Sequence, residues 1–359
     1  MFSTSIKRYL LATMAGICIP AVGTLAYLAQ DAVTDVRTNT RLTSLVEADR
    51  ALLLAGNAIR SNRGQAQTAI QATDDAAATI KRVEEANRGH IAGAIERLKA
   101  TDLAERAALA DAMAARDKQT EARLPEMYAE AAKPRAQRNL AATMPWYNGV
   151  GEIETAIVQA SGVTSNAVRM ADPALADLQA FKAAGWQVRS NYGTQCSVLR
   201  APLGSGKALE PAQIRAVGEL RGASNAGLAQ LRQLAARPGV SSELVRKVGV
   251  MTNEVVAANA MMDGLVDKLG QGTGAVIGAE DWTKQCNGPF TAIVSAVTQS
   301  LDDMAAVTRS QLNWAWTKLA IMAGLMVGLL LLCAMSWRGV QRRIAKPLES
   351  LNAALASMQ

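Results

Sequence analysis

Two stretches of the chain carry no charged residue for long enough to cross a membrane. Residues 10–28 read LLATMAGICIPAVGTLAYL and residues 319–337 read LAIMAGLMVGLLLLCAMSW, 19 residues in each case. At about 1.5 Å per residue, each nearly spans a hydrocarbon core of about 30 Å. We therefore expect two transmembrane helices. A signal peptide cleaved after Ala26 is the alternative interpretation of the first stretch.

Between these stretches, apolar residues recur at every third or fourth position. One such run extends from Leu42 to Ile80, and a second with the same phase extends from Leu178 to Leu199. This spacing is typical of helices packed along an apolar seam. It predicts a helix that continues straight out of the membrane, from Asp31 to Ala86 if it is unbroken, and no convincing strand alternation is present. We predict an all-α fold with two stacked or helix-sharing antiparallel helical bundles between two transmembrane helices.

Proline and glycine residues divide the outer region into shorter helices. We expect breaks at Pro125 and Pro134, and a turn at MPWYNGVG, residues 144–151, that separates the two helical modules. The later boundaries are Asp172-Pro173, a loop at Pro202–Lys207, a helix start at Pro211, a cap at Ser241 and a last helix that starts at Pro289. The predicted organisation is therefore an N-terminus at 1–9, module 1 at 29–145, module 2 at 146–288, a return helix at 289–318 and a linker at 338–359.

A polar motif occurs twice in this outer region. AGNAIRSNRGQ at residues 55–65 aligns without a gap with AGWQVRSNYGT at residues 184–194. Both copies lie in the middle of a predicted helix. A pair of guanidinium groups, from Arg60 and Arg189, could bind a carboxylate of an organic acid, nitrate or a similar anion bidentately. The candidate ligand-binding residues are Arg60, Asn62, Arg63, Trp186, Arg189, Asn191 and Tyr192, with Ser61 and Ser190 as further hydrogen-bonding groups.

A purely structural role for the same motif is the alternative. Gly56 and Gly185 would permit close helix packing, and Arg60 and Arg189 would pair with acidic residues of neighbouring helices. Polar residues in a helical seam often fix the register of packing without binding a ligand, so this is the more frequent outcome. A repeated motif indicates common ancestry and does not by itself establish a ligand.

The basic residues indicate an orientation in the membrane. The net charge is +7 and the pI about 9.4, but the region between the apolar stretches is close to neutral. The excess flanks the two stretches, at Lys7, Arg8, Arg338, Arg342, Arg343 and Lys346. By the positive-inside rule, both termini are expected to be cytoplasmic, with residues 31–316 periplasmic in a bacterial inner membrane protein. The pI therefore gives no reason to expect a nucleic-acid partner.

The cysteines agree with an outer region in an oxidising compartment. Cys196 and Cys286 are the only two outside the apolar stretches, so they have one possible intramolecular pairing. We expect a disulfide between them, with two free or intermolecular thiols as the alternative.

Few residues are suited to metal binding or catalysis. His90 is the only histidine, which argues against haem and zinc sites. The GSGK at 204–207 lacks the glycine spacing of a phosphate-binding loop, and no nucleophile lies in a recognisable pattern with a base. We therefore expect no cofactor and no enzymatic activity.

The end of the sequence resembles the start of a HAMP domain. Residues 338–359 read RGVQRRIAKPLESLNAALASMQ, with a basic turn, the pair Pro347-Leu348 and apolar residues spaced along a helix. HAMP domains are parallel four-helix linkers that follow the last membrane span of dimeric receptors. The resemblance implies a homodimer in which Pro347 and Leu348 relay a signal.

The overall plan resembles bacterial transmembrane chemoreceptors, the methyl-accepting chemotaxis proteins, with a double helical periplasmic sensing module. This resemblance implies a membrane receptor that senses a small extracytoplasmic solute and acts, in chemotaxis, through cytoplasmic signalling proteins. No signalling tip, kinase histidine box or cyclase domain follows in this sequence. The sensor part of a histidine kinase or diguanylate cyclase is one alternative, and a ligand-free helical scaffold or truncated receptor remnant is another.

Overall fold

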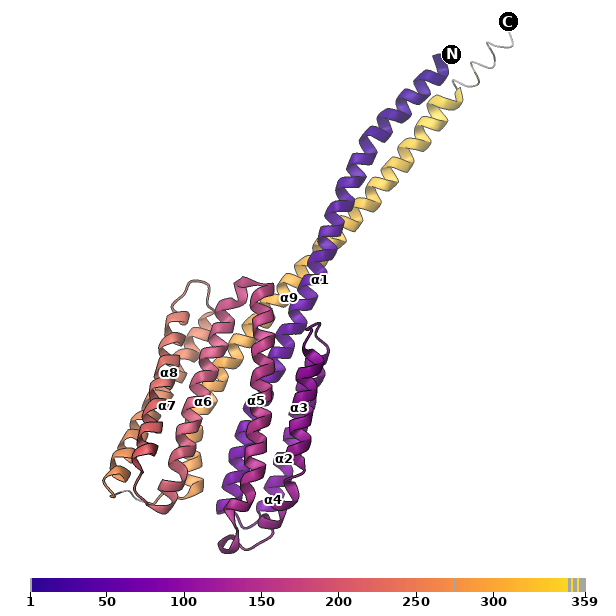
Figure 1. The fold of residues 1–359 in the computed structure, drawn as a ribbon. Helices are drawn as coiled ribbons and strands as arrows, with labels where there is room; N and C mark the ends of the chain where they lie inside the picture. The colour runs from indigo at the N-terminus through magenta and orange to yellow at the C-terminus, as the bar shows by residue number, and fades with distance from the viewer. Residues whose placement is uncertain (1, 274–275, 348–349, 351–353, 355–359) are drawn as a thin grey trace. The chain divides into compact units, whose positions relative to one another are not determined.

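The computed structural model describes residues 2–273, 276–347, 350 and 354, and these residues form helices without any strand (Figure 1). The all-α prediction is therefore confirmed for the described part of the chain. The helices are α1 (Phe2–Ala72), α2 (Ala76–Lys99), α3 (Arg106–Glu121), α4 (Leu124–Ala131), α5 (Leu140–Ala171), α6 (Ala176–Ser205), α7 (Pro211–Ala235), α8 (Ser242–Gly270) and α9 (Ala279–Val340). Short turns of other helix types are η1 (Arg135–Gln137), η2 (Pro173–Leu175) and the π-helical η3 (Gln341–Ala345).

The chain divides into two compact units, and the first contains both apolar stretches. It comprises the described residues of Met1–Thr40 and Thr308–Gln359. The Lys318 ammonium donates to carboxylate oxygens of Asp31 and Asp35, at 2.7 Å each. The most apolar parts of α1 and α9 are not buried, unlike the core helix of a soluble protein. By length and composition, both helices could cross a membrane.

The second unit, Arg41–Val307, contains two antiparallel groups of helices. One group contains residues 41–72 of α1 with α2, α3, α4 and α5. The other group contains α6, α7, α8 and the start of α9 (Figure 1). The seam residues predicted from the sequence form its core, since Leu45, Leu52 and Ile59 of α1 and Val188 and Leu199 of α6 are fully buried. Burial of these residues supplies the main driving force for the helix packing.

Two of the predicted boundaries in the first group are wrong. The helix predicted over Asp31–Ala86 is interrupted after Ala72, because Asp75 caps a new helix by accepting from the Ala78 amide at 3.3 Å. Residues 144–151 form no turn. They lie inside α5, which begins after the cap residue Asn139. Trp146 and Val150 bury side chains on one face of α5, and this packing outweighs the turn propensity of the sequence.

The border between the predicted modules at 145–146 therefore falls within a helix. The chain passes from the first group to the second at Asp172, whose side chain accepts from the Ala174 amide at 2.9 Å. Pro173 opens η2 directly after this cap, as predicted for a helix start.

Two later boundaries also differ from the prediction. α6 continues through Ser205 and ends at Gly206, whose φ of 66° is the left-handed conformation that glycine favours at helix ends. α9 begins at Ala279 rather than at Pro289. Trp282 is fully buried, and its packing stabilises the helical turns that precede Pro289. The predicted breaks at Pro125 and Pro134, the helix start at Pro211 and the cap at Ser241 are confirmed.

The segment that resembles a HAMP domain is described only in part. Pro347 lies within the described residues, whereas Leu348 lies outside them. The structure therefore does not test the resemblance.

Candidate functional site

The two copies of the repeated motif face each other across the two helical groups. Arg60 of α1 donates through Nη1 to Ser190 Oγ of α6 at 3.1 Å. Arg189 of α6 donates through Nη2 to Ser61 Oγ of α1 at 3.3 Å. Arg60 and Arg189 are equivalent positions of the motif, and so are Ser61 and Ser190. The contact is therefore reciprocal, and both copies of the motif contribute to it.

Two glycines of α6 permit close packing in this region, Gly185 against α9 and Gly193 against the Arg189 side chain. A Cβ atom at Gly185 would lie 2.3 Å from Cγ2 of Val297 on α9, and one at Gly193 would lie 2.8 Å from Nη1 of Arg189. The guanidinium of Arg189 can therefore lie along its own helix. There it stacks on the ring of Phe290, 3.8 Å from the ring centroid.

A cavity of about 260 Å³ lies beside these arginines, among α1, α6 and α9. Four arginines line it, and none of the lining residues described in the structure is acidic. The arginines are Arg60, Arg63, Arg189 and Arg200. Neutral polar groups complete the wall, among them Ser61, Gln67, Ser197, Thr283 and Asn287.

The positive charge of this cavity is only partly compensated. Arg60 forms an ion pair with Glu154 of α5 at 2.6 Å, and both side chains are largely buried. This is the acidic partner that the structural alternative anticipated. Arg189 is 3% exposed, and its partners are neutral: Asn57 Oδ1 at 3.1 Å, Ser61 and the Phe290 ring. No ion pair of Arg189 occurs among the described residues.

The pKa values of these arginines reflect first of all their burial. Burial lowers the pKa of Arg189 to about 9, and the positive charges of Arg60 and Arg63 add to the effect while Glu154 opposes it. Burial also lowers the pKa of Arg63 and of Arg200. Arg189 remains charged at neutral pH. A buried charge without a partner costs free energy, which a bound anion would reduce.

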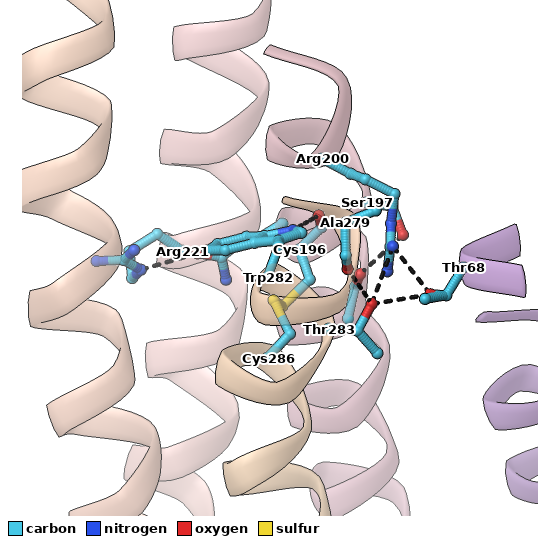
Figure 2. Close-up of a disulfide and its surroundings, with 11 residues drawn as sticks. Thr68, Cys196, Ser197, Arg200, Arg221, Ala279, Trp282, Thr283 and Cys286 are labelled. Atoms are coloured by element: carbon cyan, nitrogen blue, oxygen red, sulfur yellow. Dashed lines mark hydrogen bonds between the residues drawn. A yellow bond between two sulfur atoms is a disulfide. The ribbon is translucent and has the colours of Figure 1, made fainter. Parts of the chain in front are cut away.

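The predicted disulfide is present, and both of its cysteines line the cavity; Figure 2 shows the bond and its surroundings. Cys196 of α6 is bonded to Cys286 of α9, and Trp282 Nε1 donates to the Cys196 carbonyl at 2.9 Å. Arg200 Nη1 donates to the hydroxyls of Thr68 at 3.2 Å and Thr283 at 3.0 Å, while its Nε has no partner among the described residues. The disulfide is consistent with an oxidising compartment.

Three of the seven predicted ligand-binding residues, Arg60, Arg63 and Arg189, line this cavity. Asn62 instead donates to Asn87 Oδ1 of α2 at 2.8 Å. The remaining three predicted residues do not line it either. Tyr192 is fully buried with its ring edge-on to Phe290, Asn191 lies outside the lining, and Trp186 lines a different cavity.

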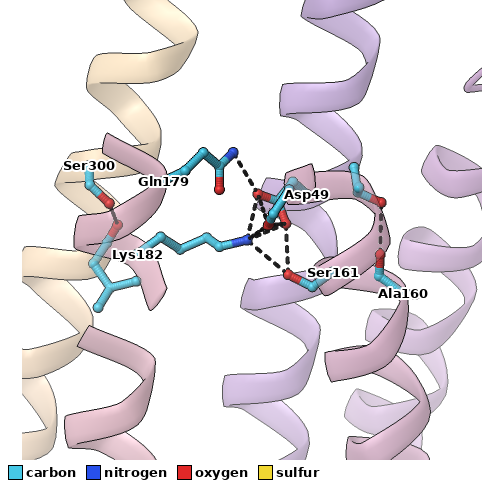
Figure 3. A network of polar contacts seen from close by, with 9 residues as sticks. Asp49, Ala160, Ser161, Gln179, Lys182 and Ser300 are labelled. Atoms are coloured by element: carbon cyan, nitrogen blue, oxygen red, sulfur yellow. Dashed lines mark hydrogen bonds and ion pairs between the residues drawn. The ribbon is translucent and has the colours of Figure 1, made fainter. Parts of the chain in front are cut away.

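Two features of this region were missed in the sequence. Arg200 lies on the same face of α6 as Arg189, eleven positions later, so helical spacing could have identified it. The other feature is a buried polar network that joins α1, α5 and α6 (Figure 3). In it, the Lys182 ammonium contacts both carboxylate oxygens of Asp49, at 2.6 and 2.7 Å. The position of Asp49 within an apolar seam is the sequence signal that could have revealed this network.

Comparison with protein-family models, with curated proteins and with solved structures found no match to this chain. What the chain does must therefore be inferred from its own residues.

Proposed function

We propose that this chain is a membrane-bound receptor whose outer helical region binds a small anion in the cavity lined by the four arginines. Arg189 carries the proposal. Its guanidinium is almost completely buried, its partners are neutral, and it faces a cavity to which two further arginines contribute without an ion pair among the described residues. Such a group gains most from an anion that enters the cavity.

The chemistry of the wall favours a small planar anion. A guanidinium presents parallel N–H groups that match a carboxylate or nitrate, and Ser61 and Asn287 add neutral hydrogen-bonding groups. The volume of about 260 Å³ suits a short organic acid or an inorganic anion, not an extended ligand. The ligand class is therefore a small carboxylate, nitrate or a similar oxyanion.

The course of two helices supports the receptor part of the proposal. α1 contributes Arg60 to the wall and α9 contributes Phe290, and the same two helices contain the apolar stretches that could cross a membrane. An anion that prefers one packing of α1 against α6 and α9 would shift the population of packings. Helix shifts of about 1–2 Å are the scale on which receptors transmit such a preference.

In the full proposal, the outer region is periplasmic, both termini are cytoplasmic and the receptor is a homodimer in the inner membrane. The signal passes along α9 to Pro347 and the HAMP-like linker, and the biological output is chemotaxis. The distribution of basic residues and the sequence after the second apolar stretch support this version.

The decisive experiment is thermal unfolding of the full chain in detergent with nitrate, acetate or succinate. Ionic strength is held constant with a bulky sulfonate. An anion at 100 times its dissociation constant should add about 2.7 kcal/mol to the free energy of unfolding. Arg189→Gln should abolish this stabilisation. Arg221→Gln should retain it, because Arg221 pairs with Asp263 and does not line the cavity.

Two results would contradict the proposal. One is the absence of stabilisation by every anion, which would favour a ligand-free scaffold. The other is stabilisation that persists in Arg189→Gln, which would place the anion elsewhere.

A further inference from the structure

A second cavity, of about 320 Å³, lies among α1, α5 and α6 and differs in character from the first. Its volume is within the range of about 300–1,000 Å³ found for small-molecule sites. Its wall is mainly apolar and includes Leu52, Leu53, Ile157, Val158 and the indole of Trp186.

The charged groups near this cavity compensate each other. Lys182 lines it, but its ammonium is held by both carboxylate oxygens of Asp49 (Figure 3). Ser161 supports the pair by donating to Asp49 Oδ1 at 2.7 Å. Arg169, the other basic residue of the wall, is exposed. The buried part of the cavity therefore offers no free charge, and an uncharged occupant suits it best.

Gln179, a residue of the wall, has one buried polar atom without a partner among the described residues. Gln179 is 3% exposed, and its Nε2 donates to Asp49 Oδ2 at 3.2 Å. Its Oε1 accepts no hydrogen bond within the described structure, and Figure 3 shows it turned away from Asp49. An unsatisfied buried acceptor of this kind is unfavourable, and a hydrogen-bond donor from a ligand would recover the lost free energy.

Trp186 provides an aromatic surface for the same occupant. It lines the cavity and is half-buried, and one edge of its ring lies over Gly56 of α1, where a Cβ atom would be 3.4 Å from Trp186 Cη2. Aromatic rings pack favourably against such a surface in offset or edge-on geometry.

We infer that this cavity is a second binding site, for a small uncharged aromatic molecule with one N–H or O–H donor. The ring packs on Trp186 between the aliphatic side chains of α1 and α5, and the donor binds Gln179 Oε1. This site does not depend on the anion site, and Arg189→Gln should leave it unchanged.

The test is calorimetric titration of the full chain in detergent with indole and with 1-methylindole, which has the same ring system without the N–H group. Titration into detergent alone corrects for partition into micelles. Indole should bind at least about tenfold more tightly, because a lost buried hydrogen bond of about 1.4 kcal/mol corresponds to that factor. Gln179→Leu should reduce the preference to less than about twofold, whatever its effect on stability.

A pair of matched glycine variants tests the location. Gly162 of α5 lines the cavity and Gly222 of α7 does not, and a Cβ at either position meets open space. Leucine has a higher helix propensity than glycine, so both variants should fold. Gly162→Leu should abolish indole binding, and Gly222→Leu should retain it.

The inference is overturned if indole does not bind, or if Gly162→Leu binds it as the parent chain does. Equal affinity for the two probes in the parent chain would also overturn it.

Discussion

Arg60 and Arg189 each donate a hydrogen bond to the serine that follows the other arginine in its own helix. The two helices therefore contact each other through equivalent groups, related as by an approximate two-fold axis. The symmetry ends at the acidic partner, because Glu154 pairs with Arg60 and no described carboxylate pairs with Arg189. In this duplicated contact, the charge of Arg60 is therefore compensated by a carboxylate, whereas the charge of Arg189 is not.

Removal of Glu154 should strengthen anion binding. Glu154→Gln deletes the negative charge that pairs with Arg60, and a unit charge at about 5–8 Å is worth roughly 2–3 kcal/mol at an effective dielectric constant of about 20. We expect nitrate or acetate to bind about tenfold more tightly or better, as measured by calorimetry. Glu152→Gln is the control, since Glu152 is exposed and pairs with Arg116. Weaker binding in Glu154→Gln would show that Glu154 orients Arg60 for the ligand.

Nitrate affinity should not depend on pH between 6 and 8. The pKa of Arg189 is lowered by burial only to about 9, and the described wall contains no histidine or carboxylate. A bound anion favours the charged guanidinium, so affinity should fall only as the pH rises through about 9. Calorimetry at constant ionic strength measures this dependence. A large change between pH 6 and 8 would reveal a titrating group that the proposed site lacks.

The buried pair of Asp49 and Lys182 should be sensitive to single substitutions. Lys182→Met leaves the Asp49 carboxylate fully buried without its cation, and such a change costs about 3–5 kcal/mol. The combination of Asp49→Leu with Lys182→Met should recover most of that loss. Urea denaturation of the full chain measures both. A single variant as stable as the parent chain would contradict the buried ion pair.

Close packing at Gly185 should make this position intolerant of a methyl group. Gly185→Ala places a Cβ atom 2.3 Å from Val297 Cγ2, and overpacking of this kind typically costs about 1–3 kcal/mol. The loss should appear as a lower melting temperature and should be relieved by Val297→Ala. Gly222→Ala, in open space on α7, should instead stabilise the chain by about 0.5–1 kcal/mol. Equal effects of the two substitutions would argue against the close contact of α6 and α9.

Periodicity allowed much of the fold to be predicted. The seam through Leu45, Leu52 and Ile59 is an extended pattern, and each of its residues contributes to the same signal. Boundaries depend on single residues and were less predictable. Pro145 lies inside α5 and Pro289 inside α9, because buried neighbours such as Trp146 and Trp282 outweigh the local preference of proline to end a helix.

The site was predictable in part for a similar reason. The repeated motif identified Arg60 and Arg189, but the sequence did not show which helix faces meet. Arg200 joins them through its position on α6, and Trp186 lines another cavity, although it lies only three residues from Arg189. Which side chains pair across helices depends on how the helices pack in the folded chain. The spacing of residues within one helix does not determine this pairing.

The bond between Cys196 and Cys286 has a mechanical consequence for the proposed receptor. It joins α6 and α9 covalently at the wall of the arginine cavity, so these two helices cannot slide past each other at that level. By contrast, α1 is held against this cross-linked pair by hydrogen bonds and packing, without a covalent bond. In the proposed receptor, a displacement produced by an anion would therefore move α6 and α9 together relative to α1, and α9 would carry that displacement toward Pro347.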